Sequence, residues 1–195
     1  VIFAGSRGQT GEPLYLPVNE EHPDNPTDIY GINKLTAEKY HKLYFDIYDV
    51  KTTVFRINNV YGPRCQIKHG HYGVLNLFIG WALQNMPLTV FGDGNQTRDY
   101  IYIDDLINAF ISIIDNSETN GESFQVGSGI ETRFIDMVNI IRDIVGNGEI
   151  VFQPFPDTLD KIDIDRFVSS FDKLKNITGW TPNVSLEKGI SKTVE

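Results

Sequence analysis

The sequence has almost no cysteine and no long apolar run. Cys65 is the only cysteine among 195 residues, so no disulfide bond can form within the chain. A reducing, cytoplasmic setting is therefore expected. No segment reaches the roughly 18 consecutive apolar residues of a membrane-spanning helix, and the first residues lack the basic-then-apolar pattern of a signal peptide. We expect no membrane partner.

Positive charge is also scarce. The chain has 17 lysines and arginines against 26 aspartates and glutamates, which gives a formal net charge of −9. A nucleic-acid binder needs a basic field over at least one face, so this balance argues against nucleic acid as a partner. A local phosphate site remains compatible with it. The 41% hydrophobic and 22% charged content is typical of a globular protein with one large or two small domains.

Predicted strands and helices alternate along the chain. Clusters of β-branched and aromatic residues predict strands at 1–4, 52–57, 88–91, 100–103, 123–126 and 149–152. Apolar residues at three- and four-residue steps predict helices at 30–48, 74–86, 106–114 and 132–145, and two short helices near 170–178 and 185–193. Thr27, Asp104 and Thr132 are the expected helix caps. The alternation favours a largely parallel α/β sheet, and a strand that starts at Val1 suggests a fragment.

The predicted helix 30–48 carries two polar residues with complementary chemistry. Tyr30 and Lys34 are four residues apart, so they share one helical face at roughly 6 Å. Free tyrosine has a pKa near 10, and a neighbouring ammonium favours the ionised phenolate that a base requires. Ser6 follows the first strand and can reach the same point, because functional groups of parallel sheets gather at the carboxyl ends of strands. The spacing alone also fits an ordinary surface pair, with Ser6 a simple turn residue.

The same helix has an apolar stripe that we expect to be buried. It consists of Leu35, Tyr40, Leu43, Tyr44 and Ile47. The tyrosines at 40, 44 and 48 are interpreted as packing residues, with an interface between two chains as the alternative.

Three later segments extend the pattern. They are RINNVYGPR at 56–64, VFGDGNQTRDYIYIDDL at 90–106 and GWTPNVSLEKGI at 179–190. With Ser6, Tyr30 and Lys34 ahead of them, this ordered set resembles the extended short-chain dehydrogenase/reductase family over essentially the whole chain. The likeness is to its NAD-dependent nucleotide-sugar epimerase and dehydratase branch, which includes UDP-glucose 4-epimerase-like enzymes.

This resemblance implies the C-terminal half of a Rossmann-type parallel sheet plus a smaller α/β substrate-binding domain. Residues 1–62 would be the remnant of the NAD-binding domain. Residues 63–195 would mainly form the substrate-binding domain, with 97–126 returning to the Rossmann sheet. A homodimer through the face of helix 28–48 is also implied.

The resemblance further implies roles for the matching residues. Tyr30 would exchange a proton with a sugar hydroxyl while hydride passes between that carbon and NAD. Lys34 would hold the nicotinamide ribose and lower the pKa of Tyr30, and Ser6 would bond the reacting oxygen. Asn58 would lie beside the cofactor.

Further residues would bind the nucleotide-diphosphate sugar. Asn59 would lie beside it, Arg98 would meet its diphosphate, and Asn76 belongs to the segment expected to shape the sugar pocket. The second phosphate-binding arginine of the family has no clean match, so Lys161 and Arg166 are both candidates. Without the resemblance, Arg98 could instead pair with Asp99 or Asp93, and the two asparagines could be loop caps. His69 and His71 are interpreted as loop residues, and no metal site is expected.

The sequence also departs from the family. The opening strand with its Gly-x-x-Gly-x-x-Gly turn, which seats the pyrophosphate of NAD, is not found ahead of Ser6. The chain alone would therefore bind NAD poorly and be inactive. Ser6 is followed by Arg7-Gly8 instead of the Asp-Glu pair of dehydratases, which disfavours dehydration. Gln9-Thr-Gly11 stands where Val-Tyr-Gly is usual. An epimerase is the leading hypothesis; a reductase, a decarboxylase or a binding module without cofactor chemistry stay open.

Overall fold

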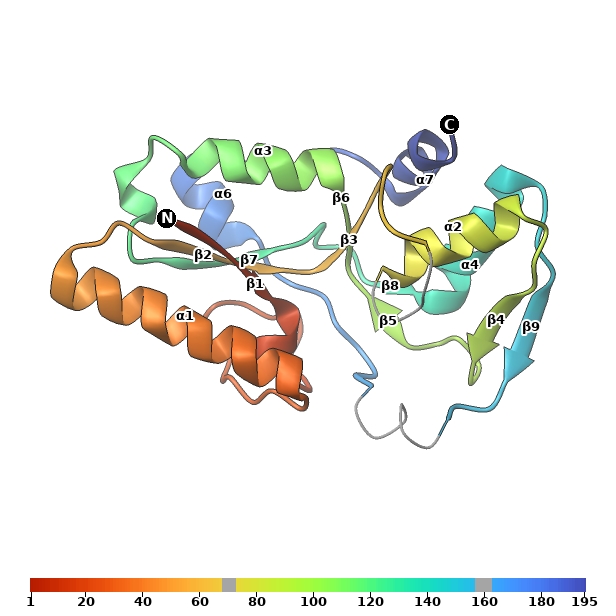
Figure 1. The fold of residues 1–195 in the computed structure, drawn as a ribbon, viewed down its shortest axis with the longest axis horizontal. Coiled ribbons are helices and arrows are strands. Elements are labelled where there is room, and N and C mark those ends of the chain that lie inside the picture. Colours follow the sequence, from red (N-terminus) through yellow and green to blue (C-terminus); the bar gives the residue numbers. More distant parts are fainter. Residues whose placement is uncertain (68–72, 157–162) are drawn as a thin grey trace.

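The computed structural model describes residues 1–67, 73–156 and 163–195 and shows an elongated molecule with two groups of elements (Figure 1). The first group is built on a three-stranded parallel sheet in the order β1-β2-β7. These strands are β1 (Ile2–Ser6), β2 (Thr53–Ile57) and β7 (Ser123–Val126). The mixed α/β class with parallel strands is thereby confirmed.

Helices cover both faces of this sheet (Figure 1). One face carries α1 (Ile29–Tyr48), and the other carries α3 (Ile103–Ile113) and α6 (Asp172–Thr178). Successive residues of a strand point to opposite faces, and β2 shows the result. Phe55 packs into the apolar core under α3 and α6, whereas Arg56 points the other way and pairs with Glu38 of α1.

The second group surrounds a separate apolar core. Strands β4 (Leu88–Phe91) and β9 (Ile150–Gln153) pair in parallel. Helices α2 (Val74–Leu83), α4 (Phe134–Val145) and α7 (Leu186–Val194) pack with them. The fully buried residues of this core are mostly aliphatic or aromatic, among them Ala82, Leu88, Val90, Met137, Val138, Ile141 and Ile190.

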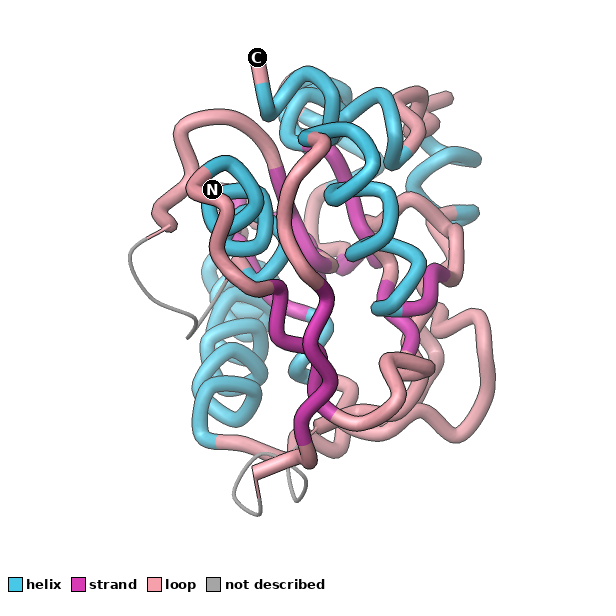
Figure 2. Tube along the Cα trace, turned by 90° about the vertical axis from the view of Figure 1, so that its right-hand side faces the viewer, coloured by secondary structure: helices cyan, strands magenta, loops and turns pink. Residues whose placement is uncertain are grey.

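Short strands connect the two groups. β3 (Asn59–Tyr61) pairs in parallel with β6 (Tyr100–Tyr102), and β5 (Thr97–Arg98) pairs antiparallel with β8 (Thr132–Arg133). Two 3-10 helices, Arg7–Gln9 (η1) and Ser117–Thr119 (η2), and an isolated bridge between Val18 and Ser169 complete the elements described. In the turned view of Figure 2, strands run between helices. Among the described residues, no helix combines the length and apolarity needed to cross a membrane.

The expected helix caps are wrong. The side chain of Asp28, not Thr27, accepts a hydrogen bond from the Gly31 amide at the start of α1. Helix α3 begins at Ile103, before Asp104, and Thr132 belongs to β8, so it does not cap α4. In each case a neighbouring residue already has the extended backbone of a cap or strand, so helix entry shifts by one or two positions.

The expected burial of the apolar stripe on α1 is also wrong. Tyr40, Leu43, Tyr44 and Ile47 are exposed, and Leu35 is only half-buried. The face of α1 turned to the sheet buries Gly31 and Glu38 instead, because polar contacts and a close backbone approach hold this helix on the sheet. The periodicity identified an apolar face correctly but not the surface that covers it.

Candidate active site

Ser6 and Tyr30 meet where β1 ends and α1 begins. Ser6 is the last residue of β1, and its Oγ accepts a hydrogen bond of 3.2 Å from the Gly8 amide. The Ser6 amide donates to Gln9 Oε1 at 2.8 Å, which closes a capping box around η1. Gly31, next to Tyr30, lets η1 touch α1, because a Cβ there would lie 2.3 Å from the Gly8 carbonyl oxygen.

Gly8 leaves open the space between the two hydroxyl-bearing side chains. A Cβ at Gly8 would lie 3.5 Å from Ser6 Oγ and 3.7 Å from Tyr30 Cδ1. No side chain of residue 8 therefore separates Ser6 from Tyr30. The Tyr30 side chain is 55% exposed, so a ligand can reach it.

Lys34 lies one turn further along α1. Its Nζ donates a hydrogen bond of 2.8 Å to the Ala4 carbonyl oxygen and lies 5.6 Å from the centroid of the Tyr30 ring. An ammonium has three donors, so two remain for a ligand after the bond to Ala4. The structure thus brings the three predicted residues Ser6, Tyr30 and Lys34 together at one end of the sheet.

These residues fit the ribose end of a nicotinamide cofactor, but a nearby glycine run does not fit its pyrophosphate. Gly5, Gly8 and Gly11 repeat the Gly-x-x-Gly-x-x-Gly spacing, with Gly5 within β1 and Gly8 within η1. The helix η1 is only three residues long, and Gly11 lies in the loop after it. A pyrophosphate turn opens an α-helix, whose N-terminal amides bind the phosphates. The run at 5–11 therefore supplies no such helix terminus.

Asn58 is buried in a polar cluster between the two groups of elements. Its Nδ2 donates to Asp99 Oδ2 at 3.0 Å and to Ser169 Oγ at 2.6 Å. Its Oδ1 is buried and accepts no hydrogen bond from any residue in the described part of the chain. Asn58 thus offers one unused acceptor, while its amide nitrogen belongs to the fold.

Asp99 is the centre of this polar cluster, a role that no sequence pattern indicates. Besides the bond from Asn58, it accepts bonds from the amide and hydroxyl of both Ser128 and Ser169 and from the Gly129 amide. Burial raises the pKa of Asp99, and the hydrogen bonds from Ser128 and Ser169 oppose that rise. Asp99 therefore joins the start of β6 to two distant turns.

Arg98 is buried and held by its own neighbours. Its Nη1 donates to the carbonyl oxygens of Thr97 at 2.7 Å and Ile164 at 2.6 Å, and its Nη2 forms an ion pair with Asp163. The alternative pairing with Asp99 or Asp93 is wrong. Asp99 faces the polar cluster, and Asp93 accepts bonds from Asn95 within its own turn.

The remaining predicted substrate residues are scattered. Asn59 Oδ1 accepts a hydrogen bond of 2.9 Å from Arg7 Nε, close to Ser6. Asn76 is buried on α2, where its Oδ1 accepts from the Gly62 amide at 3.2 Å. Arg166 is exposed and pairs with both carboxylate oxygens of Glu131, in an open groove that Asn95, Thr97, Arg133 and Asp165 also line.

Three predicted residues cannot be placed. Lys161, His69 and His71 lie outside the described residues. Within the described ranges, no group of three histidine, cysteine, aspartate or glutamate side chains is arranged to hold a metal ion.

Comparison with known proteins identifies the family. Residues 1–127 match the model of the NAD dependent epimerase/dehydratase family. The chain belongs to this family. It is 36% identical over 196 residues to a putative UDP-glucose 4-epimerase of Methanocaldococcus jannaschii, covering 100% of this chain and 61% of that protein. It is 32% identical over 200 residues to UDP-glucuronic acid decarboxylase 1 of Xenopus tropicalis, covering 100% of this chain and 46% of that protein.

A solved epimerase has the same fold. The UDP-glucose 4-epimerase of Thermotoga maritima, solved with UDP-glucose, superposes with a TM-score of 0.91 at 33% identity. The match covers 99% of this chain and 61% of the other. The chain therefore spans about three fifths of the length of these epimerases. The predicted epimerase/dehydratase branch is confirmed, and this family is one of NAD-dependent enzymes.

Proposed function

We propose that this chain is the C-terminal, catalytic and substrate-binding portion of an NAD-dependent nucleotide-sugar epimerase of the UDP-glucose 4-epimerase type. The observation that carries the proposal is the meeting of Ser6, Tyr30 and Lys34 at the end of β1. The similarity to epimerases along the whole chain supports it. Residues beyond this chain would then supply the pyrophosphate site of NAD.

The proposed chemistry is transient oxidation of one sugar hydroxyl. NAD, when bound, supplies the acceptor for a hydride and returns that hydride to the other face of the sugar carbon. Tyr30 takes the hydroxyl proton as general base and later gives it back as general acid. Lys34, with two free donors, holds the ribose hydroxyls and stabilises ionised Tyr30, and Ser6 positions the reacting oxygen by a hydrogen bond. Asn58 would meet the cofactor through its unused Oδ1.

The proposed ligand is a nucleotide-diphosphate sugar. We propose that Arg98 binds its diphosphate and that Asn59 lies beside the nucleotide sugar. Asn76 would lie near the sugar, and Lys161 or Arg166 would be a second phosphate contact. The two arginines proposed here as phosphate contacts are each paired with an acid in the structure. Arg98 pairs with Asp163, and Arg166 pairs with Glu131. The ligand would have to replace those partners or share the guanidinium with them.

One other reaction has specific support. A relative that is 32% identical is a UDP-glucuronic acid decarboxylase, so a decarboxylase of the same branch is the second candidate. The Arg7-Gly8 pair, in place of two acidic residues, argues against dehydration. The assay below distinguishes both candidates from a reductase and from a binding module without cofactor chemistry.

We also propose a homodimer through the outer face of α1. Tyr40, Leu43, Tyr44, Ile47 and Tyr48 are all exposed along this helix. Contiguous exposed apolar patches of this kind commonly mark protein interfaces. The expected setting of the dimer is the cytoplasm.

The test uses the full-length protein that contains this chain. Tyr30→Phe should lower turnover of UDP-glucose by about 10²–10⁴-fold, because one positioned acid–base group contributes that much, while UDP-glucose binding stays near wild type. Tyr48→Phe, on the same helix, is the matched control and should keep full turnover. Turnover retained in Tyr30→Phe would exclude Tyr30 as the base. Net release of CO₂ from UDP-glucuronate would identify a decarboxylase. A net change in the amount of reduced NAD would identify a reductase, and ligand binding without turnover by the wild type would identify a binding module.

A further inference from the structure

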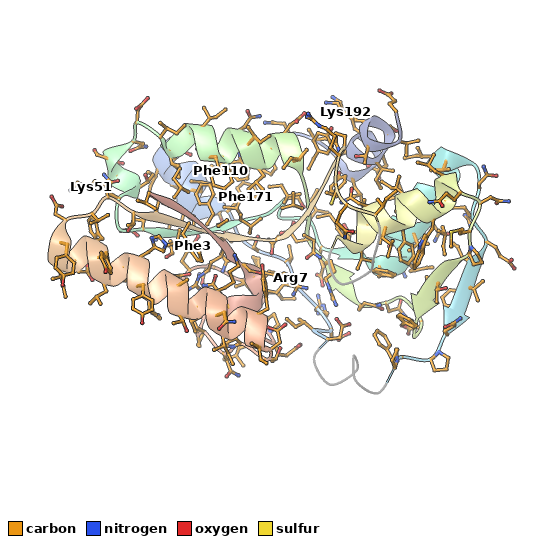
Figure 3. The ribbon with its side chains drawn as sticks, in the orientation of Figure 1. Phe3, Arg7, Lys51, Phe110, Phe171 and Lys192 are labelled. Atoms are coloured by element: carbon orange, nitrogen blue, oxygen red, sulfur yellow. The ribbon has the colours of Figure 1, made fainter. Side chains whose placement is uncertain are left out.

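Arg7 lies directly after Ser6 and has an unusual environment for a half-buried cation. Its Nε donates a hydrogen bond of 2.9 Å to Asn59 Oδ1. Its guanidinium carbon lies 5.3 Å from the centroid of the Phe167 ring, so the side chain stacks on that ring. Figure 3 labels Arg7 at the end of β1 nearest the second group of elements. The side chain is thus fixed by a hydrogen bond and a stacking contact.

The two terminal nitrogens of Arg7 are unused. Neither forms a hydrogen bond or an ion pair with any residue of the described ranges 1–67, 73–156 and 163–195. Arg56 and Arg98 are the other two arginines here with little exposure, and both contact carboxylates: Arg56 contacts Glu38 and Asp24, and Arg98 contacts Asp163. Arg7 differs because, within the part of the chain that the structure describes, its side chain bonds a neutral amide and lies over an aromatic ring but pairs with no carboxylate.

The neighbours of Arg7 make its charge costly. Burial and the nearby Arg98 cation lower the pKa of Arg7 to about 10, although Asp163 partly offsets them at longer range. Asp28 offsets them more weakly than Asp163 does, so the pKa of Arg7 stays lowered. A cluster with an excess of positive charge and two free guanidinium donors is suited to an oxyanion, which arginine binds through two parallel hydrogen bonds.

The position of Arg7 connects this charge to the catalytic residues. Ser6 precedes it, and Gly8 follows it beside Tyr30. On the other side, Asn59 and Arg98 are the residues proposed for the nucleotide sugar. We propose that Arg7 is a substrate-binding residue that binds an anionic group of the substrate through its two free Nη atoms. This inference rests on the proposed function and adds a substrate contact to it.

Two anions have the required chemistry. One is the diphosphate shared by all nucleotide sugars, and the other is the carboxylate of a sugar acid such as glucuronic acid. The test therefore titrates full-length protein with uridine, UDP, UDP-glucose and UDP-glucuronate and compares wild type with Arg7→Gln. Glutamine keeps a donor for Asn59 and much of the stacking contact but removes the charge.

Loss of one charge-assisted bidentate contact should weaken binding by roughly 10–100-fold. Equal weakening of UDP, UDP-glucose and UDP-glucuronate, with uridine unchanged, assigns Arg7 to the diphosphate. Weakening of UDP-glucuronate alone assigns it to the carboxylate. In either case, the difference in affinity between wild type and Arg7→Gln should become smaller at high salt, because salt screens the attraction between charges. A purely structural role of Arg7 would not produce this dependence on salt.

The outcomes also separate this inference from the proposed function. Unchanged affinity of Arg7→Gln for all four ligands, with wild-type binding intact, overturns the inference alone. Wild-type protein that binds none of them overturns the proposed function and the inference together. If Arg7→Gln does not fold, Arg7→Lys replaces it. Lysine keeps the charge but lacks the planar fork, so a loss of several-fold is expected for the same ligands, and no loss overturns the inference.

Discussion

Two arginine clusters near the carboxyl ends of the parallel strands β1 and β2 differ in their balance of charge. In the first, Arg56 contacts two acids, Glu38 and Asp24, and Glu38 also accepts hydrogen bonds from Gln9 and Ser123. In the second, Arg98 forms an ion pair with Asp163, whereas Arg7 is influenced by Asp163 and Asp28 only at longer range. We call these the paired cluster and the unbalanced cluster.

We propose that the two clusters have different roles: the paired cluster stabilises the fold, and the unbalanced cluster binds a ligand. Buried charges in the paired cluster satisfy one another, so the cluster fastens α1 to β2 without any ligand. Charges in the unbalanced cluster do not cancel, and the excess positive charge lies beside Ser6 and Asn59. A fold tolerates such an excess where a ligand supplies the missing negative charge.

Breaking the paired cluster should have the largest effect. Glu38→Ala leaves the buried Arg56 guanidinium with only Asp24, and removal of one partner of a buried pair costs about 3–5 kcal/mol of unfolding free energy. Denaturant unfolding measures this loss. Asp46→Ala, an exposed acid on the same helix, is the control and should change stability by less than about 0.5 kcal/mol. Equal effects of the two substitutions would contradict a stabilising role for the paired cluster.

The paired cluster should also weaken in acid. Burial raises the pKa of Glu38, but its hydrogen bonds and ion pair with Arg56 outweigh burial and lower the pKa below the ordinary value of 4.5. A lowered carboxyl pKa contributes stability that is complete above 4.5 and is lost as the pH falls through the lower, folded-state pKa. The difference in unfolding free energy between wild type and Glu38→Gln should therefore shrink below pH 4.5. A difference that stays constant down to pH 3 would exclude this linkage.

Local sequence patterns were sufficient to predict most helices and strands of the fold. Strands such as β2 and β4 and helix α1 follow from runs of β-branched or periodic apolar residues, so their positions agree within one or two residues. The proximity of Ser6, Tyr30 and Lys34 also follows from local rules, because it needs only a strand end and an i, i+4 spacing.

Contacts between residues far apart in the chain could not be predicted from the sequence. Asp163 is 65 residues from Arg98, and no local pattern indicates that they pair. Glu38 interrupts the polar and apolar pattern of α1 and becomes buried only because Arg56 lies on the facing strand. The prediction that the apolar stripe on α1 is buried was wrong for a related reason, because periodicity identifies an apolar face of a helix but not the surface that covers it. Arg7 does carry a local signal, because it is a cation directly after Ser6, the residue whose hydroxyl is proposed to be catalytic.

Removing Asp163, the acid that pairs with Arg98 in the unbalanced cluster, should have a moderate effect. Asp163→Asn breaks a pair whose acid is about one third exposed, so the expected loss of unfolding free energy is at most about 1 kcal/mol. The same change removes a competitor for Arg98 and should tighten UDP binding. Thermal unfolding and UDP titration of the same variant measure both effects. Weaker UDP binding would show that Asp163 orients Arg98 for the ligand instead of competing with it.

The smallest effect on stability is expected at Arg7. Arg7→Gln removes the bond to Asn59 in part but also removes the repulsion from Arg98, so the unfolding free energy should change by less than about 0.5 kcal/mol. Repeating the measurement at low and high salt isolates the repulsion, because screening weakens it. A loss as large as that of Glu38→Ala would mean that Arg7 is a structural residue like Arg56. In that case, charge balance would not separate the two clusters, and the stacking on Phe167 would be the reason that an arginine stands beside Ser6.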